Sequence, residues 1–205
     1  MYLPSHFTES RSDVLLAAMR ENSFATVVTA AGGVPFASHV PVLIDGQSVE
    51  GGLKIRGHFA RANPHPLADG EEMLAIFLGP HGYVSPSWYE GPRNVPTWNY
   101  VAVHAYGRVR QLGQSEARAV VKDLTDLHER TAAAPWRMES LPDDYVEKML
   151  TAIVGFEIAV DRLEGKMKLS QNRSPEDQRR VRDQLAGSGD AAARDVAAWM
   201  DRLPR

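Results

Sequence analysis

The sequence predicts an α+β protein that is mainly β, built as a β-barrel with peripheral helices and a helical C-terminal tail. Extended segments lie mostly in the first half of the 205 residues and are joined by turn residues. Segments with helical periodicity lie between and after them. The sequence contains neither the glycine-rich dinucleotide fingerprint nor a P-loop. This order favours an antiparallel barrel over an alternating parallel α/β fold, because strands joined by hairpins pair directly.

Turn and capping residues place the elements of the first half. A first helix is expected to begin at Ser10, which is followed three residues later by an acid, the spacing of a capping box. Asp45-Gly46 is the strongest hairpin signal in the chain. Asn63-Pro64 is expected to end one strand and begin a short helix, and Gly79-Pro80 is expected to end the next strand. The expected strands span residues 24–29, 34–44, 53–60, 72–78 and 100–109.

The second half is expected to contain more helix than strand. Periodic apolar residues predict helices over residues 115–130 and 143–152. Partial alternation of apolar and polar residues predicts one strand over residues 155–160. A loop that ends at Arg173 is expected to follow it.

The C-terminal tail has a clear starting signal. Ser174-Pro175 places a capping serine before a proline at the first helical position. A final short helix is expected over residues 191–203. We therefore expect two parts, which are a barrel domain with its peripheral helices over residues 1–173 and a helical tail over residues 174–205.

Composition and charge exclude several kinds of chemistry. The chain has no cysteine, which excludes disulfides, thiolate nucleophiles, zinc–cysteine sites and iron–sulfur clusters. Its formal net charge is −3, whereas domains whose main task is to bind DNA are usually basic. The one basic candidate for DNA contact is the stretch from Arg173 to Arg182, with Arg179, Arg180 and Arg182, although exposed helix faces commonly carry such charges. We expect no secretory signal and no membrane span, and hence a cytoplasmic protein.

Four segments concentrate polar and aromatic side chains. They are SHVP at 38–41, GHFARANP at 57–64, GPHGYVSPSWY at 79–89 with VPTWNY at 95–100, and KMKLSQNR at 166–173. An isoalloxazine ring needs a flat apolar or aromatic cover and hydrogen bonds to its polar edge. The phosphate of a flavin nucleotide needs arginine, lysine or hydroxyl donors. The four segments contain this set of residue types and no evident nucleophile–base pair.

Each of these features also has a purely structural interpretation. A histidine inside a strand, such as His39 or His104, is more often structural than functional. The aromatic side chains of Trp88, Tyr89 and Trp98 can equally fill a core or a dimer interface. The residues alone therefore indicate a barrel with a polar and aromatic site, and they leave its ligand open.

The four segments, taken in order, carry a resemblance to a known family. Together with MYLP at 1–4, ENSFAT at 21–26 and IVGF at 153–156 they extend over residues 1–185. In this arrangement the chain resembles the PaiB family of FMN-binding negative transcriptional regulators, and the aromatic segment 79–89 is the most specific part. The resemblance implies a split β-barrel related to the pyridoxamine-phosphate-oxidase-like flavoproteins, FMN as the cofactor, and a homodimer with two FMN sites at the subunit interface.

The same resemblance implies which side chains contact the cofactor, with residues of both chains lining each site. It places the phosphate and ribityl contacts at His58, Arg61 and Asn63. It places the contacts beside the ring at Ser38, His39, Val40, Ser85, Ser87, Trp88, Thr97, Trp98 and Asn99. Three further side chains are implied to reach the site from a late loop of either chain, namely Lys168, Gln171 and Asn172.

Three functions are compatible with this sequence. The family implies a negative transcriptional regulator, and this is the interpretation we adopt, with DNA as a weakly supported partner. The alternative is a flavin-dependent oxidoreductase that acts on a small molecule, for which His39, His58 or Tyr89 would donate protons. The third, which we favour least, is haem binding, with axial ligands drawn from His39, His58, His81 and His104.

Overall fold

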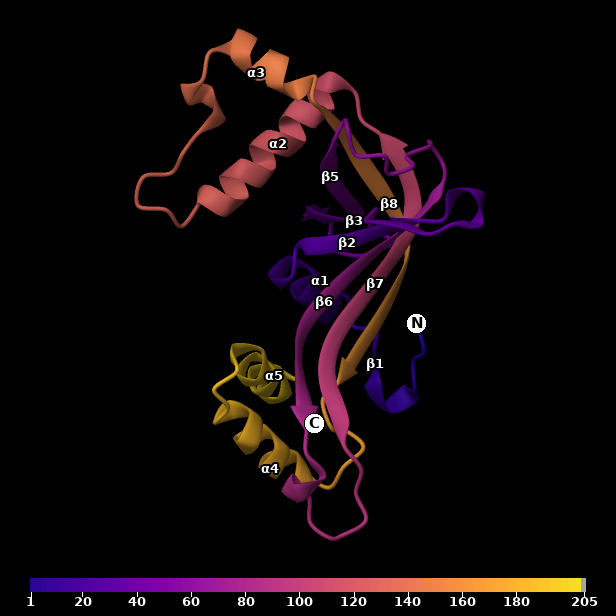
Figure 1. Ribbon diagram of the computed structural model, residues 1–205, viewed down its shortest axis with the longest axis vertical. Helices are drawn as coiled ribbons and strands as arrows, with labels where there is room; N and C mark the ends of the chain where they lie inside the picture. Colours follow the sequence, from indigo (N-terminus) through magenta and orange to yellow (C-terminus); the bar gives the residue numbers. More distant parts are fainter. Residues whose placement is uncertain (204–205) are drawn as a thin grey trace. The chain divides into compact units, whose positions relative to one another are not determined.

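The computed structural model describes residues 1–203, which form a mainly β protein with five α-helices (Figure 1). The strands are β1 (Thr8–Glu9), β2 (Phe24–Thr29), β3 (Phe36–Pro41), β4 (Leu43–Asp45), β5 (Lys54–Ala60), β6 (Glu72–Val84), β7 (Thr97–Gln111) and β8 (Ile153–Lys168). The helices are α1 (Ser12–Glu21), α2 (Gln114–Glu129), α3 (Asp143–Leu150), α4 (Pro175–Ala186) and α5 (Ala191–Arg202). The expected mainly β fold with peripheral helices is confirmed.

The strands follow the order β3-β2-β6-β7-β8-β5-β4 in one sheet, and β1 pairs with β8. The chain as a whole divides into two compact units. The terminal unit comprises Met1–Ala18, Leu78–Val103 and the chain from Glu164 onward. The central unit comprises Met19–Phe77 and His104–Leu163.

The central unit is built from antiparallel pairs. β2 pairs with β3 and with residues 74–76 of β6, while β5 pairs with β4 and with residues 153–159 of β8. Helix α2 lies beside β5 (Figure 1) and contacts both β4 and β5, and Leu43 of β4 packs in one apolar cluster with Val120 and Leu124 of α2. Burial of these side chains holds the helix on the sheet.

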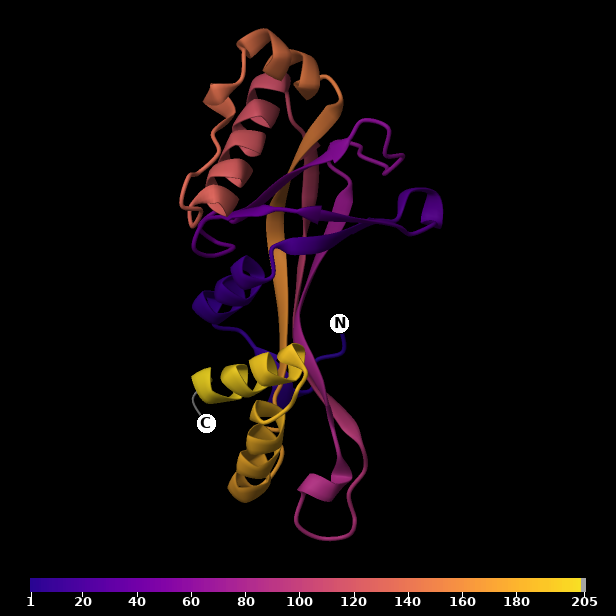
Figure 2. The same ribbon diagram turned by 60° about the vertical axis from the view of Figure 1, so that its left-hand side comes forward.

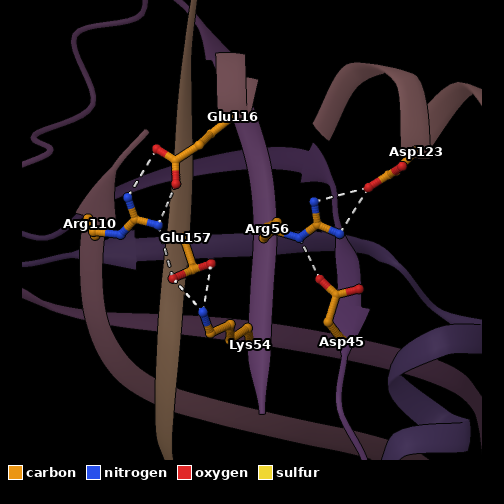
Figure 3. Close-up of polar contacts among 7 residues, drawn as sticks. All are labelled: Asp45, Lys54, Arg56, Arg110, Glu116, Asp123 and Glu157. Atoms are coloured by element: carbon orange, nitrogen blue, oxygen red, sulfur yellow. Dashed lines mark hydrogen bonds and ion pairs between the residues drawn. The ribbon is translucent and has the colours of Figure 1, made fainter. Parts of the chain in front are cut away.

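Charged side chains on the same part of the central unit join the strands to α2 (Figure 3). The guanidinium of Arg56 on β5 contacts Asp45 at 2.5 Å and Asp123 of α2 at 3.1 Å. Arg110 of β7 contacts Glu157 of β8 at 3.3 Å. The remaining members of this network are Lys54 and Glu116. The pairs are partly exposed, so we expect them to fix orientation more than to add stability.

The terminal unit contains both helices of the C-terminal tail. Figures 1 and 2 show α4 and α5 lying against each other, and the two helices bury Val181, Leu185, Val196 and Trp199. The short 3-10 helix η3 (Pro86–Trp88), which follows β6, packs against α4. None of the helices within residues 1–203 is long and apolar enough to cross a membrane.

The expected start of the first helix is wrong by two residues. The helix begins at Ser12, and the Glu9 carboxylate accepts hydrogen bonds from the backbone N–H groups of Ser10 and Arg11 at 3.0 and 2.8 Å. The serine expected to cap the helix, Ser10, thus lies in the segment before it. By contrast, the cap at Ser174 is confirmed, since its hydroxyl accepts from the N–H of Asp177 at 3.1 Å.

The expected strand 34–44 is two strands. β3 pairs with β2, and β4 pairs with β5, so the chain changes partner after Pro41. At the change, the N–H of Val42 donates to the carbonyl of Ser23 at 2.9 Å. Asp45 pairs with Lys54, so the hairpin predicted at Asp45-Gly46 forms with a longer connection than a two-residue turn.

Three other expectations need correction. The segment after Asn63-Pro64 is irregular and not a short helix. Gly79-Pro80 does not end a strand, since β6 continues to Val84. β2 pairs with β6 only up to Ile76, and beyond it proline is tolerated because an edge strand needs no N–H donor on that side. β8 extends to Lys168, well beyond the expected end at residue 160.

Candidate functional site

The side chains implied as cofactor contacts are divided between the two units. The central unit holds those of the first two segments, which are Ser38, His39, Val40, His58, Arg61 and Asn63. The terminal unit holds those of the last two segments, which are Ser85, Ser87, Trp88, Thr97, Trp98, Asn99, Lys168, Gln171 and Asn172.

Lys168 is the centre of the terminal set. It stands at the end of β8, and its ammonium donates hydrogen bonds to the hydroxyl of Thr97 and to the carbonyl of Trp98, the latter at 2.6 Å. Both acceptors lie at the start of β7. An ammonium has three N–H donors, so these two contacts leave one donor of Lys168 for a ligand. The structure thus brings together three of the residues that the sequence implied.

Burial lowers the pKa of Lys168, and the positive charges of Lys166 and Arg173 lower it further. Lys166 is itself buried and donates to the carbonyl of Tyr2 at 2.9 Å. Three cationic side chains close to one another favour the approach of an anion or of an electron-rich polar edge. This feature was not predicted for Lys166 and Arg173, although both stand in the segment 166–173.

Asn99 is buried and contacts the turn that follows β8. Its buried amide donates to the hydroxyl of Ser170 at 2.9 Å and contacts the sulfur of Met200 at 3.9 Å. Ser170 has a φ of 67°, a left-handed conformation that is uncommon for residues other than glycine. The Asn99 amide is therefore a structural partner of the turn after β8, and we assign it no free donor for a ligand.

The aromatic residues of the terminal set are partly open to solvent. The side chain of Trp98 is 51% exposed, and its ring lies 6.2 Å from that of His81 and 5.9 Å from that of Tyr83, measured between centroids. At the end of β6, the hydroxyls of Ser85 and Ser87 are 2.8 Å apart. A half-exposed indole with hydroxyl groups in the same unit has the character required to cover a flat ring.

The late loop contributes less than the sequence implied. Both ends of the Gln171 amide are used by the turn itself, since its oxygen accepts from the N–H of Leu169 at 2.7 Å and its nitrogen donates to the carbonyl of Met167. Asn172 is exposed. Of the three late residues, Lys168 is the one with a clear capacity to bind a ligand.

In the central unit, Ser38 and Asn63 meet at a histidine that the sequence analysis missed. His65 is 7% exposed, and its Nδ1 lies 3.0 Å from the Ser38 hydroxyl while its Nε2 lies 3.3 Å from that of Thr29. The amide of Asn63 donates to Ser38 at 3.0 Å, and its oxygen accepts from the N–H of His65 at 3.1 Å. The ring of His65 stacks on Phe59 at 4.7 Å. The only feature of the sequence that could have pointed to His65 is its position directly after Asn63-Pro64, at the end of the second polar segment.

The other members of the central set are not brought together in the same way. Arg61 is exposed, and its guanidinium donates to the carbonyls of Thr151 and Ile153 at 2.7 and 2.8 Å. His39 is exposed and bonds with Thr26 at 2.9 Å. Val40 is buried in the core. The buried Nδ1 of His58 has no hydrogen-bond partner within the part of the chain that is described, and burial lowers its pKa.

We predict that the His65 network makes folding stability depend on pH. Burial lowers the pKa of His65, and the charge of Glu71 raises it only in part. A depressed pKa means that the folded state holds the neutral ring, so its contribution is complete above the unfolded value of about 6.5 and is lost as the pH falls through the lower folded pKa. Urea unfolding at pH 7.5 and 5.5 is expected to show a smaller pH dependence for His65→Gln than for the wild type. Equal pH dependence in both proteins would contradict this role.

The basic stretch proposed for DNA contact is engaged with acidic groups. Arg180 contacts Glu90 at 2.7 Å, Arg182 contacts Asp183 at 3.2 Å, and Arg179 pairs with Glu176. A phosphate backbone would have to compete with these carboxylates. This arrangement reduces the weight of α4 as a DNA-binding surface.

Comparison with solved structures defines the class of fold. The flavocytochrome Anf3 from Azotobacter vinelandii has a TM-score of 0.60 at 14% identity, covering 86% of this chain and 77% of that chain. The FAD and haem binding protein from Mycobacterium smegmatis has a TM-score of 0.58 at 19% identity, covering 87% and 80%. The fold is that of the flavin-binding split-barrel proteins, as the sequence predicted.

Sequence comparison defines the family. The family described as "Putative FMN-binding domain" matches residues 1–162. The "Protease synthase and sporulation protein PAI 2" of Bacillus subtilis (strain 168) is 36% identical over 203 residues, which cover 98% of this chain and 97% of that protein. An uncharacterized protein of Emericella nidulans, AN0679, is 29% identical over 96% of this chain. The chain belongs to this family of FMN-binding domains, is of the PaiB type, and has FMN as its cofactor.

Proposed function

We propose that the protein works as a cytoplasmic homodimer that uses its FMN to exchange electrons with a small molecule. The bound FMN supplies the redox chemistry. The protein's own residues bind the flavin, orient it and tune its electronics. In this proposal each dimer holds two FMN molecules at the subunit interface, and residues of both chains line each site.

The residues present fit the chemistry of FMN. Lys168 keeps one N–H donor beyond its bonds to Thr97 and Trp98. Trp98 exposes half of an indole, a flat apolar surface of the kind that covers aromatic ligands. The buried Nδ1 of His58 has no hydrogen-bond partner among residues 1–203, which is unusual for a buried polar atom and accords with a ligand contact.

The observation that carries the redox proposal is the group of three cationic side chains formed by Lys168, Lys166 and Arg173. A positive charge beside the polar edge of a flavin stabilises the electron-rich form and therefore favours uptake of electrons. Lys168 is held in place by Thr97 and Trp98, and Lys166 and Arg173 add to the positive potential.

A second candidate function is regulation of transcription. It is favoured by the name of the Bacillus subtilis relative, which refers to protease synthesis and sporulation. The ion pairs of Arg179, Arg180 and Arg182 speak against α4 as the DNA contact. In a regulator, DNA binding would have to come from another surface of the dimer or from a protein partner.

The first test combines spectroscopy with a measurement of mass. The purified protein is titrated with FMN while flavin fluorescence is followed, and its mass is measured by light scattering at micromolar concentration. Saturable quenching, a dimeric mass and NAD(P)H-dependent bleaching of the flavin absorbance are expected. A monomer would refute the interface site, and a flavin that no small-molecule reductant bleaches, combined with salt-dependent DNA binding, would favour the regulator.

Arg61 provides a test of the phosphate assignment. We predict that Arg61→Ala weakens FMN binding by about 10- to 100-fold, because a charge-assisted hydrogen bond contributes roughly 1.5–3 kcal/mol. Riboflavin, which lacks the phosphate, serves as the matched ligand, and its affinity is expected to change little. If FMN and riboflavin lose affinity equally, Arg61 acts only through its bonds to Thr151 and Ile153.

A further inference from the structure

The loop between β6 and β7 is attached to the start of α4 at several points, all within the terminal unit. This loop, residues 86–96, carries Ser87 and Trp88, which are implied to contact the cofactor. Its first turn is η3, which packs against α4. Figure 1 shows the two segments side by side at one end of the terminal unit, and Figure 2 agrees.

Arg173 contacts both ends of the loop. Its guanidinium lies 4.3 Å from the centre of the Tyr89 ring, and its Nη1 donates to the side-chain oxygen of Asn94 at 3.0 Å. Asn94 in turn donates to the carbonyl of Gly91 at 3.0 Å, which closes the turn between the two contacts. Tyr89 is 6% exposed, so the stacked pair is well shielded from water and its attraction is correspondingly stronger.

The first turns of α4 add two further contacts at Glu90. The backbone N–H of Glu90 donates to the Asp177 carboxylate at 2.8 Å. The Glu90 carboxylate accepts from Arg180 at 2.7 Å. The first of these restrains the backbone of the loop directly, whereas the second is an exposed ion pair and contributes less.

We propose that Arg173, Asp177 and Arg180 form a clamp that sets the position of Ser87 and Trp88, and that α4 is therefore a positioning element for the cofactor. The proposal gives α4 a role other than the DNA contact considered from the sequence. It rests on the proposed cofactor contacts of loop 86–96. The three residues act through the loop and are positioning residues.

The physical argument is one of conformational freedom. A loop of this length, with three prolines and a glycine at φ 82°, would otherwise sample many arrangements, and ordering it on binding would cost affinity. Contacts that order the loop beforehand remove that cost. Loss of the clamp should therefore raise the dissociation rate of FMN and alter the environment of the ring.

The test compares two clamp variants with two matched controls on neighbouring residues. Arg173→Lys keeps the charge near Lys168 but loses the planar group that stacks on Tyr89 and bonds to Asn94. Asp177→Ala removes the acceptor for Glu90. The controls are Arg179→Lys and Asp183→Ala, which make the same chemical changes on α4 at side chains whose ion pairs stay within the helix segment.

Two readouts separate the clamp from the cofactor site. Hydrogen exchange of residues 86–96 without FMN reports the order of the loop, and visible circular dichroism with the FMN dissociation rate reports the flavin environment. The clamp variants are expected to raise loop exchange and FMN dissociation by roughly tenfold. The controls should change neither. Unchanged loop exchange would overturn the clamp, and faster exchange with an unaltered flavin spectrum and dissociation rate would overturn its positioning role.

Failure of the proposed function gives a different pattern. If the wild-type protein binds no FMN, the cofactor contacts of Ser87 and Trp88 are refuted and the positioning role falls with them. Hydrogen exchange would then still show whether Arg173 and Asp177 hold the loop. The two failures are therefore distinguishable.

Discussion

Replacing Lys168 by methionine is expected to weaken FMN binding by about 10- to 100-fold, the effect of losing a charged hydrogen-bond donor worth roughly 1.5–3 kcal/mol. Methionine keeps much of the length of the side chain and removes its charge. The hydroxyl of Thr97 and the carbonyl of Trp98 would lose a partner, so part of the loss would come from a less ordered start of β7. Fluorescence quenching of FMN measures the affinity directly.

The pH dependence of binding distinguishes the charge of Lys168 from its shape. The pKa of Lys168 is lowered by burial, by Lys166 and by Arg173. The protonated form is the one that attracts the flavin, so affinity should be retained at neutral pH and fall as the pH rises through a pKa below that of an ordinary lysine. Lys168→Met should abolish this alkaline transition. Lys148→Met, which makes the same change at an exposed position of α3, should leave the FMN affinity and its alkaline transition intact.

An equal affinity for wild type and Lys168→Met, with unchanged thermal stability, would show that Lys168 does not contact the flavin. The phosphate assignment at Arg61 and the clamp around loop 86–96 would be unaffected, since each is tested with its own variants.

Substitution of Gly107 by alanine is expected to destabilise the central unit by about 3 kcal/mol. A Cβ at this position of β7 would lie 2.7 Å from the carbonyl carbon of Ala159 and closer still to its oxygen. It would also lie 2.9 Å from Cγ2 of Ile158. β7 and β8 are neighbours in the sheet, so relief requires the two backbones to separate, which breaks their hydrogen bonds as well as their packing.

Chemical denaturation followed by circular dichroism tests this expectation. Gly189→Ala is the matched control, because a Cβ at Gly189 meets no atom within 4 Å and the substitution should alter stability by only a few tenths of a kcal/mol. A Gly107→Ala protein as stable as the control would mean that β7 and β8 are farther apart at this point than the structure shows.

The sequence determined those features that depend on residues close together in the chain. The start of α4 at Ser174 needs only a hydroxyl, a proline and four consecutive residues. The mainly β class follows from the succession of strand-forming segments and turns. The family follows from the order of the four polar and aromatic segments, and its FMN cofactor comes with it.

The tertiary structure decided the features that depend on distant partners. The change of partner after Pro41, and the continuation of β6 through Pro80, result from which strand lies alongside at each point. Nothing local reveals this, because hydrogen bonds between strands join residues far apart in sequence. The residues around Asn63 show the same effect, since the ring nitrogens of His65 bond to Ser38 of β3 and Thr29 of β2, which lie far from it in the sequence.

The candidate site was likewise half determined by sequence. The family resemblance implied FMN and named Thr97, Trp98 and Lys168, which the structure brings into contact. The same resemblance implied that Asn99 and Gln171 contact the cofactor, whereas the fold uses their amides to hold the turn after β8. A polar side chain can bind a ligand only if folding leaves its donors or acceptors without a partner in the protein. Which groups are left in that state depends on the three-dimensional arrangement.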